Sequence, residues 1–190
     1  MLASRPRTFR LMETKHKLEV DIREISQDDA AAAAALSAEL GYPADTDMMR
    51  ARIERLSAMA DHGLFAACQG TRVIGWIHVL AAHHLQGDPR AEIGGLIVAA
   101  GARSTGVGAL LVQRAEQWAR ERGFDAILVR SQIMRDAAHR FYLREGYERT
   151  KTSAVFTKKL RAGFKIDESG GGSSDPPSAV GSKDPTPRQS

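Results

Sequence analysis

The segment that most constrains the fold runs from Ala91 to Val129. An apolar stretch at 91–98 ends in a glycine-rich turn, an amphipathic helix is predicted over 106–122, and a second apolar stretch follows at 126–129. Two strands joined by a helix that packs back onto their sheet lie parallel, with a right-handed crossover. The segment therefore predicts a βαβ unit, and with it a domain whose sheet is at least partly parallel.

The rest of the chain predicts antiparallel elements around this unit. Apolar alternation is typical of strands, and apolar residues at helical spacing are typical of amphipathic helices. We therefore expect an α/β fold with a mixed, mostly antiparallel sheet and helices on both of its faces. The predicted elements are a strand at 18–25, helices at 28–40 and 46–59, a hairpin of 64–68 with 73–80, a loop at 81–90, a helix at 136–145 and a strand pair within 148–159.

The charge is distributed unevenly along the 190 residues. The formal net charge is +4, and residues 1–17 alone hold five Lys or Arg and one Glu, whereas 161–190 hold four residues of each sign. We expect a basic flexible tail at 1–17, one domain at 18–160, and a disordered Gly/Ser/Pro-rich tail at 161–190. A nucleic-acid-binding domain carries its basic face on the fold itself, so we expect no nucleic-acid partner.

Cysteine usage and hydropathy bear on the compartment. Cys68 is the single cysteine, so no internal disulfide can form, and it is expected in the core. Apolar runs stay below the roughly 18 residues that span a bilayer, and the N-terminus lacks the apolar region of a secretory signal. We expect a cytoplasmic protein without a membrane partner. The His and Cys spacing does not match a metal site, so no metal is expected.

The glycine-rich turn has the features of an anion site. A helix that opens on glycines presents unpaired N–H groups and the positive end of its dipole, and Arg103 adds a charge beside Gly106 and Gly108. The alternative is an ordinary strand-to-helix turn that uses glycines. Gly94 and Gly95 favour the first interpretation, because glycines inside a strand indicate a bulge or a ligand backbone that lies close.

Two motifs then resemble the GCN5-related N-acetyltransferase (GNAT) superfamily. Arg103-x-x-Gly106-x-Gly108 after an apolar strand is similar to its acyl-CoA signature, and the run from Asp136 to Tyr147 is similar to its second motif. The order of predicted elements over 18–160 also matches. One departure is Arg135, which stands where the second motif often has an asparagine.

The resemblance implies acetyl-CoA as co-substrate. It places the pantetheine arm and the thioester on the strand backbone, the diphosphate at the helix start, and a general acid at Tyr142. The implied cofactor-binding residues are Leu96, Ile97, Val98, Arg103, Ser104, Thr105, Gly106, Val107, Gly108 and Ala109.

Amine acetylation also needs a proton acceptor, because a primary amine with a pKa near 10.4 is protonated at pH 7. Glu92 is the predicted base: by strand alternation it shares a face with Gly94, Leu96 and Val98. The alternative is that Glu92 only touches solvent at the open end of the strand. The predicted reaction is direct attack in a ternary complex, without a covalent enzyme intermediate.

The sequence says less about the roles of the histidines and about the identity of the amine acceptor. His83 and His84 could relay a proton or simply be exposed, and His78 is expected to be structural. The acceptor is predicted to be a small-molecule amine or a peptide amine. Acids at Glu39, Asp45 and Asp47 could attract it or act only as solvated caps.

Two further expectations concern function and assembly. The alternative to an enzyme is a non-catalytic acyl-CoA-binding regulatory module. A homodimer is possible through an edge strand near the C-terminal strand pair.

Overall fold

The computed structural model describes residues 19–39 and 41–158. The chain divides into two compact units after Ala154, and the described helices and strands all belong to the first. The tails expected at 1–17 and 161–190 lie outside the described residues. Among the helices that the structure describes, none combines the length and the apolar character needed to cross a membrane.

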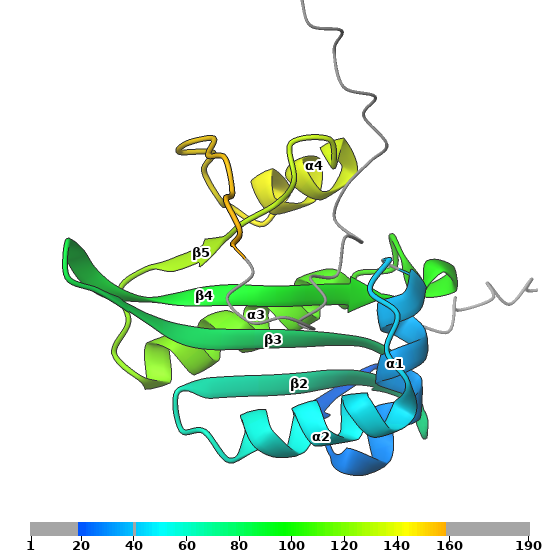
Figure 1. Ribbon diagram of the computed structural model, residues 1–190. Coiled ribbons are helices and arrows are strands. Elements are labelled where there is room, and N and C mark those ends of the chain that lie inside the picture. Colours follow the sequence, from blue (N-terminus) through cyan, green and yellow to red (C-terminus); the bar gives the residue numbers. More distant parts are fainter. Residues whose placement is uncertain (1–18, 40, 159–190) are drawn as a thin grey trace, which may run out of the picture. The chain divides into compact units, whose positions relative to one another are not determined.

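A five-stranded sheet forms the centre of the first unit (Figure 1). The strands follow one another in chain order, and all neighbours are antiparallel except the last pair, which is parallel. The predicted mixed, mostly antiparallel sheet is confirmed, and so is the parallel βαβ unit. The strands are β1 (Asp21–Glu24), β2 (His62–Gln69), β3 (Arg72–His84), β4 (Gly87–Val98) and β5 (Ile127–Val129).

Helices cover both faces of this sheet. In Figure 1, α1 and α2 lie in front of it and α3 lies behind it. Each face buries its own cluster: Leu111 and Trp118 of α3 pack behind the sheet, whereas Leu36 of α1 and Ile53 of α2 pack in front. The helical segments are η1 (Gln27–Asp29), α1 (Ala30–Glu39), α2 (Thr46–Ser57), η2 (Ala100–Ala102), α3 (Val107–Glu121) and α4 (Asp136–Arg144).

The expected loop at 81–90 is wrong. Strands β3 and β4 continue through it as a hairpin, with Ala82 opposite Arg90 and His84 opposite Gly87. The register shifts between these two pairs, so the bulge accommodates Pro89, which lacks an N–H to donate. The polar sequence and the proline predicted a loop because a bulged, exposed ribbon has the same composition.

The expected C-terminal strand pair is also not found. Residues 148–158 contain no strand, and Lys159 lies outside the described residues. Val155 and Phe156, the large apolar residues of this stretch, are both exposed, so they bury little surface against a sheet. The predicted homodimer would form through an edge strand near this pair. It stays a prediction, but residues 148–158 do not provide such a strand.

Candidate active site

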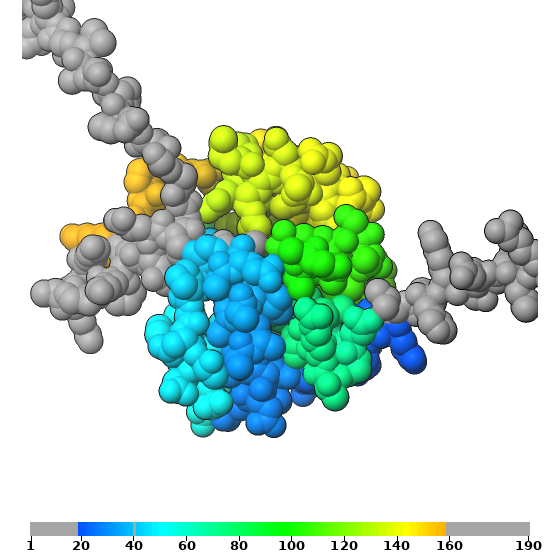
Figure 2. Space-filling view, turned by 90° about the vertical axis from the view of Figure 1, so that its right-hand side faces the viewer, coloured from blue at the N-terminus to red at the C-terminus, as the bar shows by residue number. Residues whose placement is uncertain are grey.

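A large cleft opens where β4 and β5 separate. Their parallel pairing ends at Ile93 and Val129, and β4 continues to Val98 paired only with β3. The cleft has a volume of about 1140 Å³ and is lined by β4, the start of α3, the segment 129–138 and parts of α1, α2 and α4. In Figure 2, the yellow α4 segment lies across from the blue and cyan segments of α1 and α2.

A β-bulge at Gly94 shapes the floor of the cleft. His78 pairs with Gly95 and Val79 pairs with Ile93, which leaves Gly94 as the extra residue. A Cβ on Gly94 would lie 3.0 Å from His78 Nδ1, and one on Gly95 would lie 2.9 Å from Trp76 Cζ3. Both glycines therefore present the same side to the front face, and the prediction of a bulge is confirmed.

The bulge reverses the side-chain alternation beyond it. Ile93 packs in the rear core, and after the extra residue Leu96 and Val98 also pack there, while Ile97 packs in front. The expectation that Glu92 shares a face with Leu96 and Val98 is therefore wrong. Glu92 alternates with Ile93 and so belongs to the front face.

The turn before α3 has a backbone geometry that suits an anion. Ser104 has φ 63° and Gly106 has φ 94°, so two left-handed residues lie just before the helix. Such alternation turns successive backbone N–H groups toward one point, and the first turn of a helix adds further unpaired N–H groups. Gly108 lets Phe141 of α4 approach, because a Cβ there would lie 3.2 Å from the ring.

The structure brings most of the predicted cofactor-binding residues to the cleft. Thr105 and Val107 do not line it: the Thr105 hydroxyl donates to the Ala102 carbonyl at 2.7 Å, and the Val107 side chain is buried in the core. Val107 can therefore meet a ligand only through its backbone, whereas Thr105 is exposed. The residues that line the cleft are Leu96, Ile97, Val98, Arg103, Ser104, Gly106, Gly108 and Ala109.

Arg103 ties the turn to two other elements. Its Nε donates to the Val98 carbonyl at 3.0 Å, and its Nη2 lies 3.5 Å from Glu39 Oε2 of α1. Glu39 also accepts from the Ala100 N–H at 3.2 Å. The predicted phosphate-binding arginine is thus held at the mouth of the cleft, where its remaining N–H groups can meet an anion.

Tyr142 reaches the cleft from α4. Its ring contacts Phe141, with centroids 5.1 Å apart, and Tyr147, with centroids 5.4 Å apart. Burial raises the pKa of the Tyr142 hydroxyl to about 12. The group therefore stays protonated near neutral pH and can act as a hydrogen-bond donor.

Glu92 is held by an ion pair. Arg130, which follows β5, donates from Nη1 to Glu92 Oε1. Arg130 lines the cleft and Glu92 does not. Glu92 therefore stays a predicted base, with one of its two carboxylate oxygens held by Arg130.

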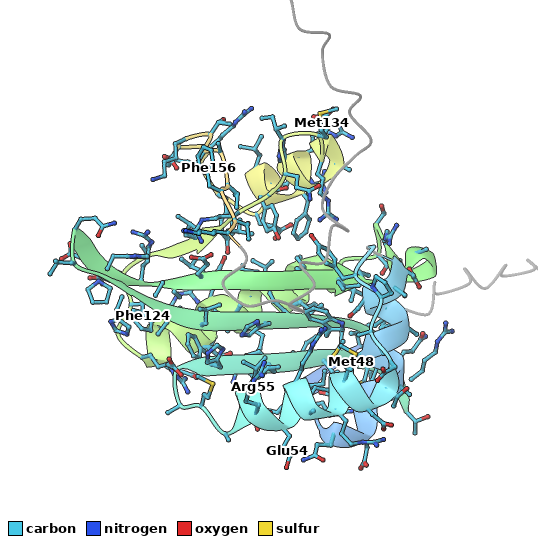
Figure 3. All side chains as sticks on the ribbon, in the orientation of Figure 1. Met48, Glu54, Arg55, Phe124, Met134 and Phe156 are labelled. Atoms are coloured by element: carbon cyan, nitrogen blue, oxygen red, sulfur yellow. The ribbon has the colours of Figure 1, made fainter. Side chains whose placement is uncertain are left out.

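His83 and His84 lie at the end of β3 and not in the loop that the sequence predicts. His83 and His84 are exposed near the β3–β4 turn, where His83 contacts Phe124 with centroids 6.4 Å apart. In Figure 3, Phe124 marks this end of the sheet, whereas Met134, which lines the cleft, lies toward α4. A relay through His83 and His84 would start far from the bulge.

His78, which the sequence predicts to be structural, lines the cleft beside Gly94 and Gly95. Its Nε2 lies 2.7 Å from His62 Nδ1 of β2. Burial, with a smaller effect of the nearby His62, lowers the pKa of His78 to about 4, so its imidazole is neutral at pH 7. Sequence alone offered only the alternation of His78 with Trp76 and Leu80, which is equally typical of a core position.

The predicted acceptor-side acids all have local partners. Glu39 pairs with Arg103, the Asp45 carboxylate accepts from Met48 N at 2.7 Å, and Asp47 lies 3.2 Å from Arg50. Of the three acids, only Glu39 lines the cleft. No group of three or more His, Cys, Asp or Glu side chains that could hold a metal ion occurs among the residues that the structure describes.

The chain is similar to known acetyltransferases. An uncharacterized N-acetyltransferase of Bacillus subtilis (strain 168) is 27% identical over 117 residues, which cover 62% of this chain and 82% of that protein. The aminoalkylphosphonate N-acetyltransferase of Salmonella typhimurium is 36% identical over 95 residues, which cover 50% of this chain and 60% of that protein, less than two thirds of its length.

Among solved structures, an aminoglycoside antibiotic 6′-N-acetyltransferase from Acinetobacter baumannii shares the fold. Its TM-score is 0.67 at 21% identity, and the match covers 75% of this chain and all of that one. The profile of the acetyltransferase (GNAT) family matches residues 23–147, which is more than half of the chain. These findings confirm the predicted fold and enzyme class: the chain belongs to the GNAT family and is an acyl-CoA-dependent N-acetyltransferase.

Proposed function

We propose that this enzyme transfers the acetyl group of acetyl-CoA to the primary amine of a small molecule, by direct attack within a ternary complex. The observation that carries the proposal is the opening between β4 and β5, which is lined both by the concavity of Ser104 and Gly106 and by Tyr142 of α4. The unpaired strand backbone suits an amide-bearing arm, and the helix start suits its diphosphate. The residues present therefore fit acetyl-CoA.

Each group has a chemical task in this proposal. Backbone groups of 96–98 hold the pantetheine arm and the thioester, and one of their N–H groups stabilises negative charge on the thioester oxygen. Tyr142 donates its proton to the leaving sulfur. Cys68, the single cysteine, is buried on β2 and does not line the cleft, which supports direct attack on the thioester rather than an acyl-cysteine.

The front half of the cleft supports a small acceptor. It is mostly apolar, with Trp76, Met49 and Leu56 in its lining, and Arg52 of α2 lies among them. Arg52 could receive an anionic group on the acceptor, such as a phosphonate. The names of the relatives, an aminoalkylphosphonate and an aminoglycoside acetyltransferase, also support a small-molecule amine over a peptide.

The test measures binding and turnover separately. Calorimetric titration with acetyl-CoA is expected to show binding that Gly106→Trp abolishes, because an indole at the helix start fills the concavity. Release of CoA thiol is then followed with an aminoalkylphosphonate, an aminoglycoside and a short peptide as acceptors. Tyr142→Phe is expected to retain acetyl-CoA binding and to lower kcat about 10²-fold.

The outcomes separate an enzyme from a regulatory module. Turnover that falls in Tyr142→Phe supports the proposal. Acetyl-CoA binding without thiol release for every acceptor favours the alternative, a non-catalytic acyl-CoA-binding module. If neither acetyl-CoA nor CoA binds, the proposed cofactor site is refuted.

A further inference from the structure

We propose that His78 is the group that accepts the proton of the attacking amine, and that His62 positions it and receives the proton from it. The inference rests on the proposed function and adds a residue role to it. It starts from two imidazoles that lie on neighbouring strands, β2 and β3, and touch through their ring nitrogens on the front face of the sheet.

The two rings form an in-plane hydrogen bond rather than a stack. Their planes differ by 14°, their centroids are 5.0 Å apart, and His62 Nδ1 lies 2.7 Å from His78 Nε2. Stacked rings at that centroid distance would not bring two nitrogens so close, whereas nearly coplanar rings that meet edge to edge do. One of these nitrogens therefore carries the hydrogen and the other accepts it.

The neighbour of His62 selects the direction of this hydrogen bond. Asp61 Oδ1 lies 3.8 Å from His62 Nε2, so a hydrogen on that nitrogen is favoured electrostatically. His62 Nδ1 is then an acceptor, and His78 donates to it from Nε2. The remaining nitrogen of His78, Nδ1, is left with a free lone pair, which is the form a proton acceptor requires.

This lone pair faces the cleft through the gap that Gly94 leaves. A Cβ on Gly94 would lie 3.0 Å from His78 Nδ1, so any side chain there would cover the nitrogen. Gly94 is exposed, and both residues line the cleft. Gly95, the strand partner of His78, immediately precedes the 96–98 backbone proposed to hold the thioester. The base and the reacting carbon would therefore lie on adjacent strands.

The charge nearest to the pair favours the transfer. Asp61 lies beside His62. Of the other charged groups on this side, Arg52 of α2 lines the same cleft and would oppose the transfer if it came close, and Glu92 on the front face of β4 is paired with Arg130. His78 has a low pKa because it is buried, but it need not hold the charge. As Nδ1 accepts a proton, Nε2 passes its own to His62, and the positive charge ends beside Asp61 and solvent.

The transfer balances as one sequence. The amine first releases one proton to solvent and enters in its neutral form. Its nitrogen bonds to the acyl carbon, the carbon–sulfur bond breaks, one proton of the nitrogen moves to His78, and the sulfur takes a proton from Tyr142. Exchange with solvent then removes the proton from His62 and returns one to Tyr142. No oxidant, metal or covalent enzyme intermediate takes part in these steps.

The test is a set of variants measured with the best acceptor of the panel above. His78→Gln keeps a polar group for His62 but removes the cleft-facing nitrogen, and it is expected to lower kcat by 10² to 10³-fold with an unchanged Kd for acetyl-CoA. His84→Gln, on the exposed turn, is the matched control and is expected to change nothing. Glu92→Gln, at the other predicted base, is expected to lower kcat less than His78→Gln does.

Two readouts distinguish chemistry from packing. Added imidazole is expected to restore part of the turnover of His78→Ala. Nitrogen NMR of the labelled wild type is expected to show His78 as a neutral Nε2–H tautomer down to about pH 5. His62→Asn is expected to lower kcat about tenfold at constant KM, and to change the His78 nitrogen shifts.

The proposal and the proposed function can fail separately. If the wild type acetylates an amine and His78→Gln retains its kcat, or if His78 is the Nδ1–H tautomer, the role of His78 is refuted and the enzyme function stands. A loss in Glu92→Gln that exceeds the loss in His78→Gln likewise refutes it and favours Glu92 as the base. If the wild type releases no thiol with any acceptor, the proposed function fails, and this inference fails with it.

Discussion

The carboxylate of Asp29 is buried on the front of the domain and accepts four hydrogen bonds. Its two oxygens accept from Arg23 Nη1 at 2.7 Å and Nη2 at 2.8 Å, and Oδ2 also accepts from Ser26 N at 2.8 Å and Ser26 Oγ at 3.1 Å. Asp29 is 8% exposed. These four bonds hold β1 and Ser26 to η1, which leads directly into α1. We therefore expect Asp29→Asn to destabilise the domain, and because Asp29 does not line the cleft, the site should be unaffected.

The magnitude follows from the donors that the amide would leave unpaired. All four groups that contact the Asp29 carboxylate are hydrogen-bond donors. In Asp29→Asn the NH₂ group is also a donor, so it cannot bond to Arg23 or Ser26. At least one charge-assisted hydrogen bond is therefore lost. Such a bond contributes about 1.5–3 kcal/mol. The Arg23 side chain is 40% exposed and can bind water instead, so the loss of the ion pair itself contributes little to the fall in the free energy of unfolding. We expect the free energy of unfolding to fall by about 2–3 kcal/mol, and Tm by roughly 10 °C.

The pH dependence of the free energy of unfolding tests whether the lost stability comes from the ionised Asp29 carboxylate. The hydrogen bond from Arg23 is the largest of the effects that lower the pKa of Asp29 below its ordinary value of 3.8. A lowered folded-state pKa means that the stabilisation is present above the unfolded pKa and is lost as the pH falls through the folded one. The stability difference between wild type and Asp29→Asn should therefore be constant from pH 5 to 8 and shrink below about pH 4.

Urea unfolding at several pH values is the assay, with Asp47→Asn as the matched control. Asp47 forms an exposed pair with Arg50 and its side chain is 93% exposed, so its loss should cost below about 0.5 kcal/mol. The buried His78 titrates equally in wild type and variant, so its contribution cancels in the difference. The reasoning is refuted if Asp29→Asn costs no more than the control, or if its cost is unchanged at pH 2.5.

Two further predictions concern the interior of the sheet. Gly63→Ala would place a Cβ 2.6 Å from Nε1 of Trp118, which is 2% exposed, and is expected to lower the free energy of unfolding by about 1–3 kcal/mol. Gly87→Ala, with nothing within 4 Å, is the control, and equal urea midpoints for the two variants would contradict the expected clash. Burial raises the pKa of the Cys68 thiol, so labelling by a thiol reagent at pH 8 should be slow in the native protein and fast in urea. Rapid stoichiometric labelling without denaturant would show that β2 opens readily.

The sequence was most informative where the structure depends on local pattern. The βαβ unit needs only an apolar run, a helix start and a second apolar run, and all three are contiguous in the chain. Arg103, Gly106 and Gly108 can be predicted for the same reason, since a candidate anion site at a helix start is built from residues close together in the chain. The structure brings all three to the cleft.

Sequence reasoning failed where the outcome depends on strand register. His62 and His78 meet because Leu64 pairs with His78 and His62 pairs with Leu80, which puts the two histidines at diagonal positions. A slip by one residue would send one of them to the other face. The pattern around His78 contains no sign of this pairing, so a core histidine and a cleft histidine are indistinguishable at that stage.

The bulge at Gly94 connects the two halves of the proposed chemistry. With regular pairing, the backbone after Ile93 would keep its alternation, and Leu96 and Val98 would turn away from the rear core that they now fill. The extra residue puts Gly94 and Gly95 side by side on the front face, where neither carries a side chain to cover His78 or Trp76. Because one irregularity both orients the strand proposed to hold the thioester and uncovers the nitrogen proposed to accept the amine proton, the two glycines are more constrained than strand packing alone would require.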